Sequence, residues 1–231
     1  MLENWKIFSK EELKLKRIVA INCSPRTIWN TATLVREAAK GAEAQGAVVK
    51  VIDLYKLEPF TGCISCFGCK LPEHLGKCIC KDALASVLEA IRNADGLIIG
   101  TPNYLGDVSA GFRALFERLI FQSLTYKTEV QSYHKKQIPV LMIMTSNASE
   151  DFFAQIGYDA MLQRYQGSFN TFVGPAKILI SSDTLQVKDY SRYNWTMFDP
   201  VHKKERHEAV FPEDKQKAYA LGEQMVGGAW E

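Results

Sequence analysis

The chain has 231 residues, 47% of them hydrophobic and 23% charged, which is ordinary for a globular protein and long enough for one domain with a sizeable core. Its 28 basic and 26 acidic residues nearly balance, which gives no support to a nucleic-acid-binding surface. No apolar run approaches the roughly 20 residues that a membrane-spanning helix needs, so we expect no membrane partner.

The first residues mix acids and bases and lack the uninterrupted apolar core of a signal peptide. We expect residues 1–15 to form a short solvated extension and the protein to be cytoplasmic. Thiols stay reduced in that compartment, which argues against disulfides among the six cysteines.

Five short apolar runs predict strands, at residues 17–23, 47–54, 96–101, 138–145 and 176–181. Segments with helical periodicity separate them, at residues 31–45, 82–91 and 112–120, within 150–166, and at 213–226. We expect Asp82 to be the N-cap of the second of these helices. Strands that are apolar along their whole length and alternate with helices predict a parallel sheet covered on both faces. The expected fold class is therefore α/β, a three-layer doubly wound domain with a five-stranded parallel sheet.

Two segments do not fit this alternation, residues 122–137 and an irregular insertion at 183–212 that carries Tyr190, Tyr193 and Trp195. Both are too long for plain connectors. We expect them to be functional loops or contacts with a partner subunit.

In an open parallel sheet the ligand binds outside the carboxyl ends of the strands. The segment after the first strand, NCSPRTIWNTATL (22–34), is small, polar and basic, and it leads into a helix. Backbone N–H groups at a helix N-terminus favour an anion, to which Ser24 and Thr31 could add hydroxyls and Arg26 a charge. The alternative is a simple turn in which Asn30 or Thr31 caps the helix; the dinucleotide fingerprint G-x-G-x-x-G is absent.

Three motifs carry a resemblance to a known family. Ser-Pro-Arg at 24–26, followed by Asn30-Thr31, resembles the phosphate loop of the flavodoxin-like NAD(P)H-dependent FMN reductases. TPNYLGDVSAGFRALFERL (101–119) resembles that family's flavin-ring segment. The cysteine-rich loop at 60–81 is similar to that of the iron–sulfur flavoprotein branch. The resemblance spans residues 17–120 and concerns only the fold beyond that point.

The resemblance implies a single flavodoxin-like domain over residues 1–231 that binds FMN and uses NAD(P)H as co-substrate. The residues that it implies for the FMN phosphate are Ser24, Arg26, Asn30, Thr31 and Ala32. Those that it implies for the flavin ring are Pro102, Asn103, Tyr104, Leu105 and Gly106, and the pocket would be completed by Thr145, Ser146 and Asn147. Cys23 stands where the family usually has glycine, and we expect it to be a small buried hydrophobe.

The activity implied is hydride transfer from NAD(P)H to the flavin, with electrons passed on to a quinone-like, nitro or azo compound or to a protein acceptor. Hydride transfer requires no acid or base from a side chain, so we name no catalytic residue. Relatives pack as homodimers or homotetramers, and residues 190–198 are the expected subunit contact. The alternatives are an iron–sulfur electron carrier reduced by ferredoxin and a non-enzymatic protein that lost its cofactor.

The cysteine-rich loop contains Cys63, Cys66, Cys69 and Cys78 at a spacing typical of cluster-binding runs. One interpretation is a [4Fe–4S] cluster on these four thiolates, and a second is a zinc site on the same thiolates with His74. The third is a loop without metal, because the spacer KLPEHLGK (70–77) resembles the lengthened loop of cluster-free relatives. These interpretations stay open at the level of sequence.

Overall fold

The structure is a computed structural model that describes residues 15–134, 136–228 and 230; all but the last residue of the predicted N-terminal extension lies outside these ranges. Its parallel strands are β1 (Arg17–Asn22), β2 (Val48–Asp53), β3 (Gly96–Tyr104), β5 (Val140–Thr145) and β6 (Ala176–Ser181). They pair in the order β2-β1-β3-β5-β6, which is the flavodoxin-like order, and the predicted fold class is confirmed. A two-residue strand β4 (Asp107–Val108) adds an antiparallel hairpin to the end of β3.

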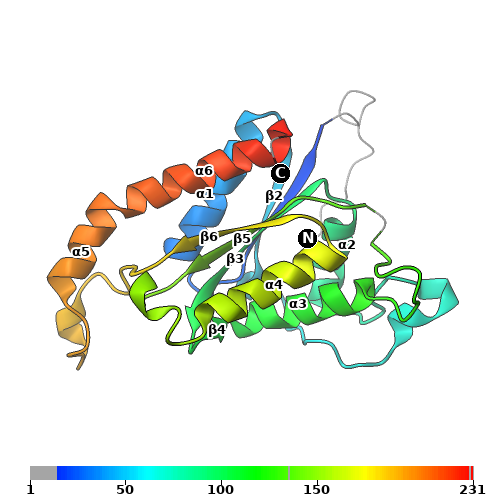
Figure 1. The fold of residues 1–231 in the computed structure, drawn as a ribbon, viewed down its shortest axis with the longest axis horizontal. Helices are drawn as coiled ribbons and strands as arrows, with labels where there is room; N and C mark the ends of the chain where they lie inside the picture. The colour runs from blue at the N-terminus through cyan, green and yellow to red at the C-terminus, as the bar shows by residue number, and fades with distance from the viewer. Residues whose placement is uncertain (1–14, 135, 229, 231) are drawn as a thin grey trace.

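Helices cover both faces of the sheet (Figure 1). They are α1 (Asn30–Ala44), α2 (Ala83–Arg92), α3 (Ala110–Ser123), α4 (Tyr158–Phe172), α5 (Pro200–Ala209) and α6 (Phe211–Gly227). Successive residues of β1 point to opposite faces, as a strand requires. Ile18 and Ala20 join the core beneath α1 and α6, whereas Val19 and Ile21 join the core beneath α2, α3 and α4.

The segments that connect the strands and helices contain short 3₁₀ helices. They are η2 (Leu54–Lys56), η3 (Gly68–Lys70), η4 (Pro72–His74), η5 (Glu150–Phe152) and η6 (Tyr190–Arg192). Two of them, η3 and η4, give local structure to the cysteine-rich loop. Within the described part of the chain, no helix combines the length and the apolar character needed to cross a membrane.

Two glycines let α1 and α6 approach each other closely. A Cβ added at Gly222 would lie 1.9 Å from the carbonyl oxygen of Ala38, and one at Gly41 would lie 2.0 Å from that of Tyr219. Real Cβ atoms do not approach backbone oxygens so closely, so any larger residue would push the helices apart. This contact fixes the position of α1, whose N-terminus borders the candidate site.

The prediction of an irregular insertion at 183–212 was wrong over its C-terminal part, where α5 forms. The Asp199 side chain caps this helix by accepting a hydrogen bond from the N–H of Val201 at 2.9 Å. Lys203 is its only buried residue, so the segment has no apolar stripe from which a helix could be predicted. Helix α6 continues from α5, and α5 itself lies beyond the sheet (Figure 1).

Candidate functional site

A pocket of about 270 Å³ lies at the carboxyl ends of β1, β3 and β5. Residues predicted for FMN binding converge on it from all three strand exits: Ser24, Arg26, Asn30, Thr31, Pro102, Asn103, Tyr104, Thr145 and Asn147 line its wall. This is the position in which open α/β sheets bind ligands.

Four other predicted residues do not line this pocket. Ala32 is fully buried in α1, and Ser146 is buried behind the pocket, where its Oγ accepts a hydrogen bond from the N–H of Ala148 at 3.1 Å. Leu105 and Gly106 form the tip of the β3–β4 hairpin with φ angles of 54° and 86°, and the Leu105 side chain is fully exposed. Their contribution is to turn the hairpin that carries Asn103 and Tyr104.

The loop after β1 is ordered by its own polar groups. The N–H of Ser24 donates to Asn22 Oδ1 at 3.1 Å, and the N–H of Arg26 donates to Ser24 Oγ, also at 3.1 Å. Trp29 occupies the N-cap of α1 without a side-chain cap, so the alternative of a turn capped by Asn30 or Thr31 was wrong. Cys23 is fully buried, as expected, and burial raises the pKa of its thiol.

Both candidate capping residues instead tie the loop to other parts of the fold. Thr31 Oγ1 lies 2.7 Å from Thr145 Oγ1, which joins the start of α1 to the end of β5. Asn30 Nδ2 donates to the carbonyl oxygen of Leu185 at 2.8 Å. The pocket floor is therefore preorganised by contacts between segments far apart in the sequence.

The sequence prediction missed one wall, which comes from residues 184–187 and Trp195. The Arg26 guanidinium donates to the carbonyl oxygen of Gln186 at 2.6 Å and lies 4.1 Å from the centroid of the Trp29 ring. Burial lowers the pKa of Arg26, and the nearby Tyr104 acts in the opposite direction. The only sequence signal for this wall was the aromatic character of the 183–212 segment.

Two polar atoms of the residues around the pocket are buried without a partner. Asn147 Oδ1 and Gln186 Oε1 have no hydrogen-bond partner among the described residues. Buried polar atoms in folded proteins are nearly always paired, so an unpaired acceptor calls for an explanation. A ligand that carries hydrogen-bond donors would provide one.

The first residue of α4, Tyr158, contacts the β3–β4 hairpin. Tyr158 donates a hydrogen bond of 2.5 Å to Asn103 Oδ1, which also accepts from the N–H of Gly106 at 3.2 Å. One face of the hairpin is thus held by a short hydrogen bond, while Tyr104 remains 45% exposed beside the pocket.

The cysteine-rich loop forms a second, smaller site against α3. Its five cysteines line one cavity together with Arg118 and Gln122 of α3. These cysteines are Cys63, Cys66, Cys69, Cys78 and Cys80. All are free thiols. Among the residues that the structure describes, however, no group of three or more potential ligands is arranged to hold a metal ion. His74 is exposed and does not line the cavity, so the zinc interpretation with His74 is not supported.

Arg118 supplies a buried positive charge beside these thiols. Its side chain is 1% exposed and forms an ion pair with Asp82 at 2.6 Å, and it donates to the carbonyl oxygen of Cys80 at 3.1 Å. Its Nε has no partner within the described residues. Asp82 also caps α2, as predicted, by accepting from the N–H of Leu84 at 3.1 Å.

The model of the NADPH-dependent FMN reductase family matches residues 16–155. The chain belongs to this family. The match confirms the resemblance inferred from the phosphate-loop and hairpin motifs, and it covers all three strand exits that line the pocket.

The curated proteins to which this chain is similar include iron–sulfur flavoproteins. One from Methanocaldococcus jannaschii is 36% identical over 104 residues, covering 44% of this chain and 51% of that protein. One from Archaeoglobus fulgidus is 33% identical over 104 residues, covering 44% of this chain and 48% of that protein. The chain thus spans about half the length of the curated relatives it matches.

Solved structures agree on the fold. An NAD(P)H:quinone oxidoreductase from Methanothermobacter marburgensis superposes with a TM-score of 0.67 at 12% identity, covering 91% of this chain and 97% of that one. An azoreductase from Bacillus anthracis gives a TM-score of 0.64 at 11% identity, covering 91% of this chain and all of that one. At such identities the likeness concerns the fold alone.

Proposed function

We propose that this protein is an FMN-dependent oxidoreductase that takes hydride from NAD(P)H and passes electrons to a quinone-like, nitro or azo compound or to a protein acceptor. The observation that carries the proposal is the pocket at the ends of β1, β3 and β5, with unpaired acceptors at Asn147 and Gln186. The family membership of the chain supports FMN as the occupant. When bound, FMN accepts the hydride and supplies the redox chemistry.

The residues after β1 fit the phosphate of FMN. Among the residues that the structure describes, no side chain caps the first turn of α1, which leaves its N–H groups suited to an anion. Arg26 adds a positive charge, and Ser24 and Thr31 add hydroxyl groups at the same wall. We infer that these groups bind the phosphate through charge-assisted and neutral hydrogen bonds.

The hairpin residues fit the flavin ring. Pro102 and Asn103 provide a rigid backbone edge, and the half-exposed Tyr104 provides an aromatic wall. The side-chain amide oxygen Asn147 Oδ1 would be an acceptor for a donor of the ring or of the ribityl chain. These residues would position the ring and adjust its electronics, without moving a proton themselves.

The test is whether the purified protein binds FMN and whether NAD(P)H reduces that FMN. We expect flavin absorption after incubation with FMN and desalting, and anaerobic bleaching of that absorption by NADPH or NADH. A protein that retains no FMN would support the alternative of a fold that lost its cofactor. Retained FMN that is bleached by dithionite and by neither nicotinamide would overturn the reductase assignment.

A second candidate function is an iron–sulfur flavoprotein that carries electrons. It is favoured by the cavity lined by five cysteines and by the names of the curated relatives. The thiols as placed do not form a preorganised metal site, so binding would require the loop to rearrange. Anaerobic reconstitution with ferrous iron and sulfide tests this candidate: a stoichiometric chromophore lost in Cys69→Ser supports it, and iron that is removed by desalting excludes it.

We further propose a cytoplasmic homodimer or homotetramer in which residues 190–198 contribute to the subunit contact. The exposure of Met197, at 85%, supports an uncovered apolar position in this segment. Light scattering of wild type and Met197→Asp would test it, since a charge at a subunit contact should lower the assembly mass. An unchanged mass would exclude this contact.

A further inference from the structure

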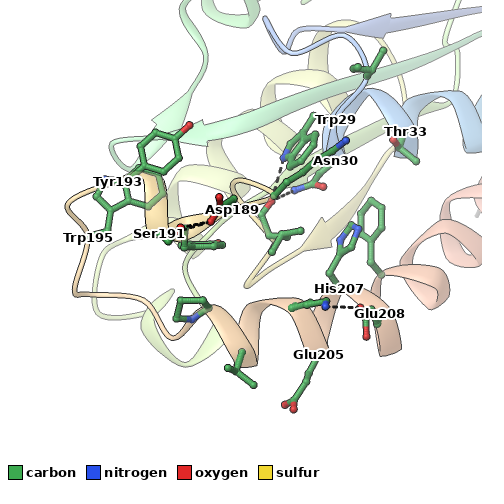
Figure 2. A pocket seen from close by; sticks show the side chains of 18 residues that line it. Trp29, Asn30, Thr33, Asp189, Ser191, Tyr193, Trp195, Glu205, His207 and Glu208 are labelled. Carbon is green, nitrogen blue, oxygen red and sulfur yellow. Dashed lines mark hydrogen bonds and ion pairs between the residues drawn. The ribbon is translucent and has the colours of Figure 1, made fainter.

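A second cavity, of about 1070 Å³, lies beside the candidate flavin pocket (Figure 2). The two share Trp29, Asn30, Leu185 and Trp195 as lining residues. The two cavities are therefore adjacent, on either side of these four side chains. No residue motif in the sequence predicted this second cavity.

Aromatic rings line the cavity at two ends (Figure 2). Tyr193 and Trp195 stack on each other with ring centroids 4.5 Å apart and planes 17° apart. His207 stacks on Phe211 at 4.9 Å and 20°. Tyr193 and Trp195 are 44% and 41% exposed, so their stack still offers ring surface to a planar ligand.

The charged groups that line the cavity suit a ligand with several polar parts. Lys188 and Lys204 come from different segments and could contact phosphate oxygens, although Lys204 also lies 3.9 Å from Glu208. Glu205 is a carboxylate of the kind that accepts hydrogen bonds from ribose hydroxyls. Asp189 Oδ1 already accepts from the N–H and the hydroxyl of Ser191, at 3.0 and 2.6 Å, so this carboxylate would offer its Oδ2. An aromatic base, a ribose and phosphates together describe a nucleotide, and the nucleotide that the proposed NAD(P)H substrate carries beside its nicotinamide half is an adenine nucleotide.

The wall formed by α5 is held in place, so the cavity is preformed. Lys203 is 5% exposed at its side chain, donates to the carbonyl oxygen of Asn147 at 2.7 Å and forms an ion pair with Asp183. Arg206 pairs with the buried Asp214 of α6 at 2.7 Å. Because Asn147 also lines the flavin pocket, the same contact sets the spacing between the two cavities.

We propose that this cavity binds the adenosine half of NAD(P)H, while the nicotinamide half reaches the flavin pocket past Trp29 and Trp195. The inference rests on the proposed function, because it names the site of that function's nicotinamide substrate. Binding would come from stacking of the adenine on Tyr193 and Trp195 and from contacts of its phosphates with Lys188 and Lys204.

The first experiment compares hydride donors on FMN-loaded wild type: NADPH, NADH and reduced nicotinamide mononucleotide, which lacks the adenosine half. We expect a KM for the mononucleotide at least about tenfold above that for the better dinucleotide. Val201→Trp places a large ring in the cavity from a position that is 64% exposed, and Tyr193→Ala removes part of the stack. Each should raise the dinucleotide KM by about tenfold and leave the mononucleotide KM unchanged.

The matched controls lie outside both cavities. Val130→Trp and Tyr126→Ala make the same changes at positions that are 50% and 68% exposed, and neither should alter any KM. Binding can also be measured without catalysis, with 5′-AMP as a ligand that contains adenosine and no nicotinamide. It should quench tryptophan fluorescence saturably in wild type and Val130→Trp, and not in Val201→Trp.

The outcomes separate the two proposals. Equal KM values for mononucleotide and dinucleotide in FMN-loaded wild type, or unaltered dinucleotide KM values in both cavity variants, would overturn the adenosine site and leave the reductase function standing. A wild type that binds no FMN, or whose FMN no nicotinamide reduces, would overturn the proposed function and this inference with it.

Discussion

The carboxylate of Glu117 accepts a hydrogen bond from the backbone N–H of Cys63, with 3.3 Å between Oε2 and the nitrogen. Gly62 makes this approach possible, because a Cβ there would lie 2.5 Å from the same oxygen. Helix α3 thus holds the start of the cysteine-rich loop through one side chain.

The same side chain links that loop to the β3–β4 hairpin. Glu117 Oε1 accepts from Arg113 Nε at 3.0 Å, and Arg113 also donates to the Tyr165 hydroxyl at 3.3 Å. Tyr165 in turn donates to Asp107 Oδ1 at 2.8 Å. A continuous chain of hydrogen bonds therefore joins the thiol cavity to the hairpin of the candidate flavin pocket.

Glu117→Gln should loosen the cysteine-rich loop. Glutamine keeps the shape of the side chain, but only its oxygen can accept, so its NH₂ group would face one of the two donors, Cys63 N–H or Arg113 Nε. One hydrogen bond is then lost, and the other becomes neutral and about half as strong. We expect faster hydrogen–deuterium exchange in residues 62–66 and faster modification of the loop thiols by a disulfide reagent. Glu43→Gln, at an exposed position of α1, is the control. Identical exchange and thiol rates in both variants would show that Glu117 does not hold the loop.

Asp82→Asn should be strongly destabilising. The substitution leaves the Arg118 guanidinium, whose side chain is 1% exposed, without its carboxylate partner. Breaking a buried ion pair from one side costs about 3–5 kcal/mol of unfolding free energy. Urea denaturation measures this loss, with Asp151→Asn at an exposed position as the control. A loss no larger than that of the control would mean that the Asp82–Arg118 pair is not important for stability.

The same pair predicts a pH dependence. Burial alone would raise the pKa of Asp82, but the hydrogen bonds from Arg118 and from the N–H of Thr61 outweigh it, and the pKa lies below its ordinary value. A carboxylate of this kind stabilises the fold above its unfolded pKa, about 3.9, and loses that contribution as the pH falls through the folded pKa. We expect the unfolding free energy of wild type to fall below about pH 4 more steeply than that of Asp82→Asn. Parallel pH profiles would contradict this.

Gly222→Ala tests the packing of α6 on α1. A methyl group there would meet the Ala38 carbonyl oxygen at 1.9 Å, and overpacking of this kind costs about 1–3 kcal/mol. Gly167→Ala is the matched control, because a Cβ at that exposed position of α4 meets nothing within 4 Å. We expect the midpoint temperature of thermal unfolding to fall for Gly222→Ala. It should rise slightly for Gly167→Ala, because alanine stabilises a helix by about 0.5–1 kcal/mol relative to glycine. Equal shifts would refute the close-contact explanation.

The sheet and most helices could be predicted because their burial imposes a regular pattern. The strand predicted at 176–181 coincides with β6, and Asp82 caps α2 as predicted. Helix α5 could not be found in this way, since only Lys203 of its ten residues is buried and periodicity carries no signal there. The available signal was the capping pair Asp199-Pro200, which is local and easily mistaken for a turn.

The candidate site could be predicted only where a short sequence motif contains the residues that line one wall of the pocket. Ser24, Arg26 and Tyr104 lie in short motifs next to strand ends, and all three line the pocket. Gln186 and Trp195 reach it from a segment more than 150 residues beyond the phosphate loop. Their position depends on tertiary contacts, such as that between Asn30 and Leu185, for which the sequence has no local pattern.

FMN affinity measured by fluorescence titration on wild type, Arg26→Ala and Arg164→Ala tests the central claim most directly. Arg26 lines the pocket, whereas Arg164 is an exposed arginine of α4 that lines neither cavity. Loss of a charge-assisted phosphate contact costs about 1.5–3 kcal/mol, so Arg26→Ala should bind FMN about 10- to 100-fold more weakly while Arg164→Ala matches wild type. Equal FMN affinity in all three proteins, or no FMN binding by wild type, would contradict the assignment of this pocket.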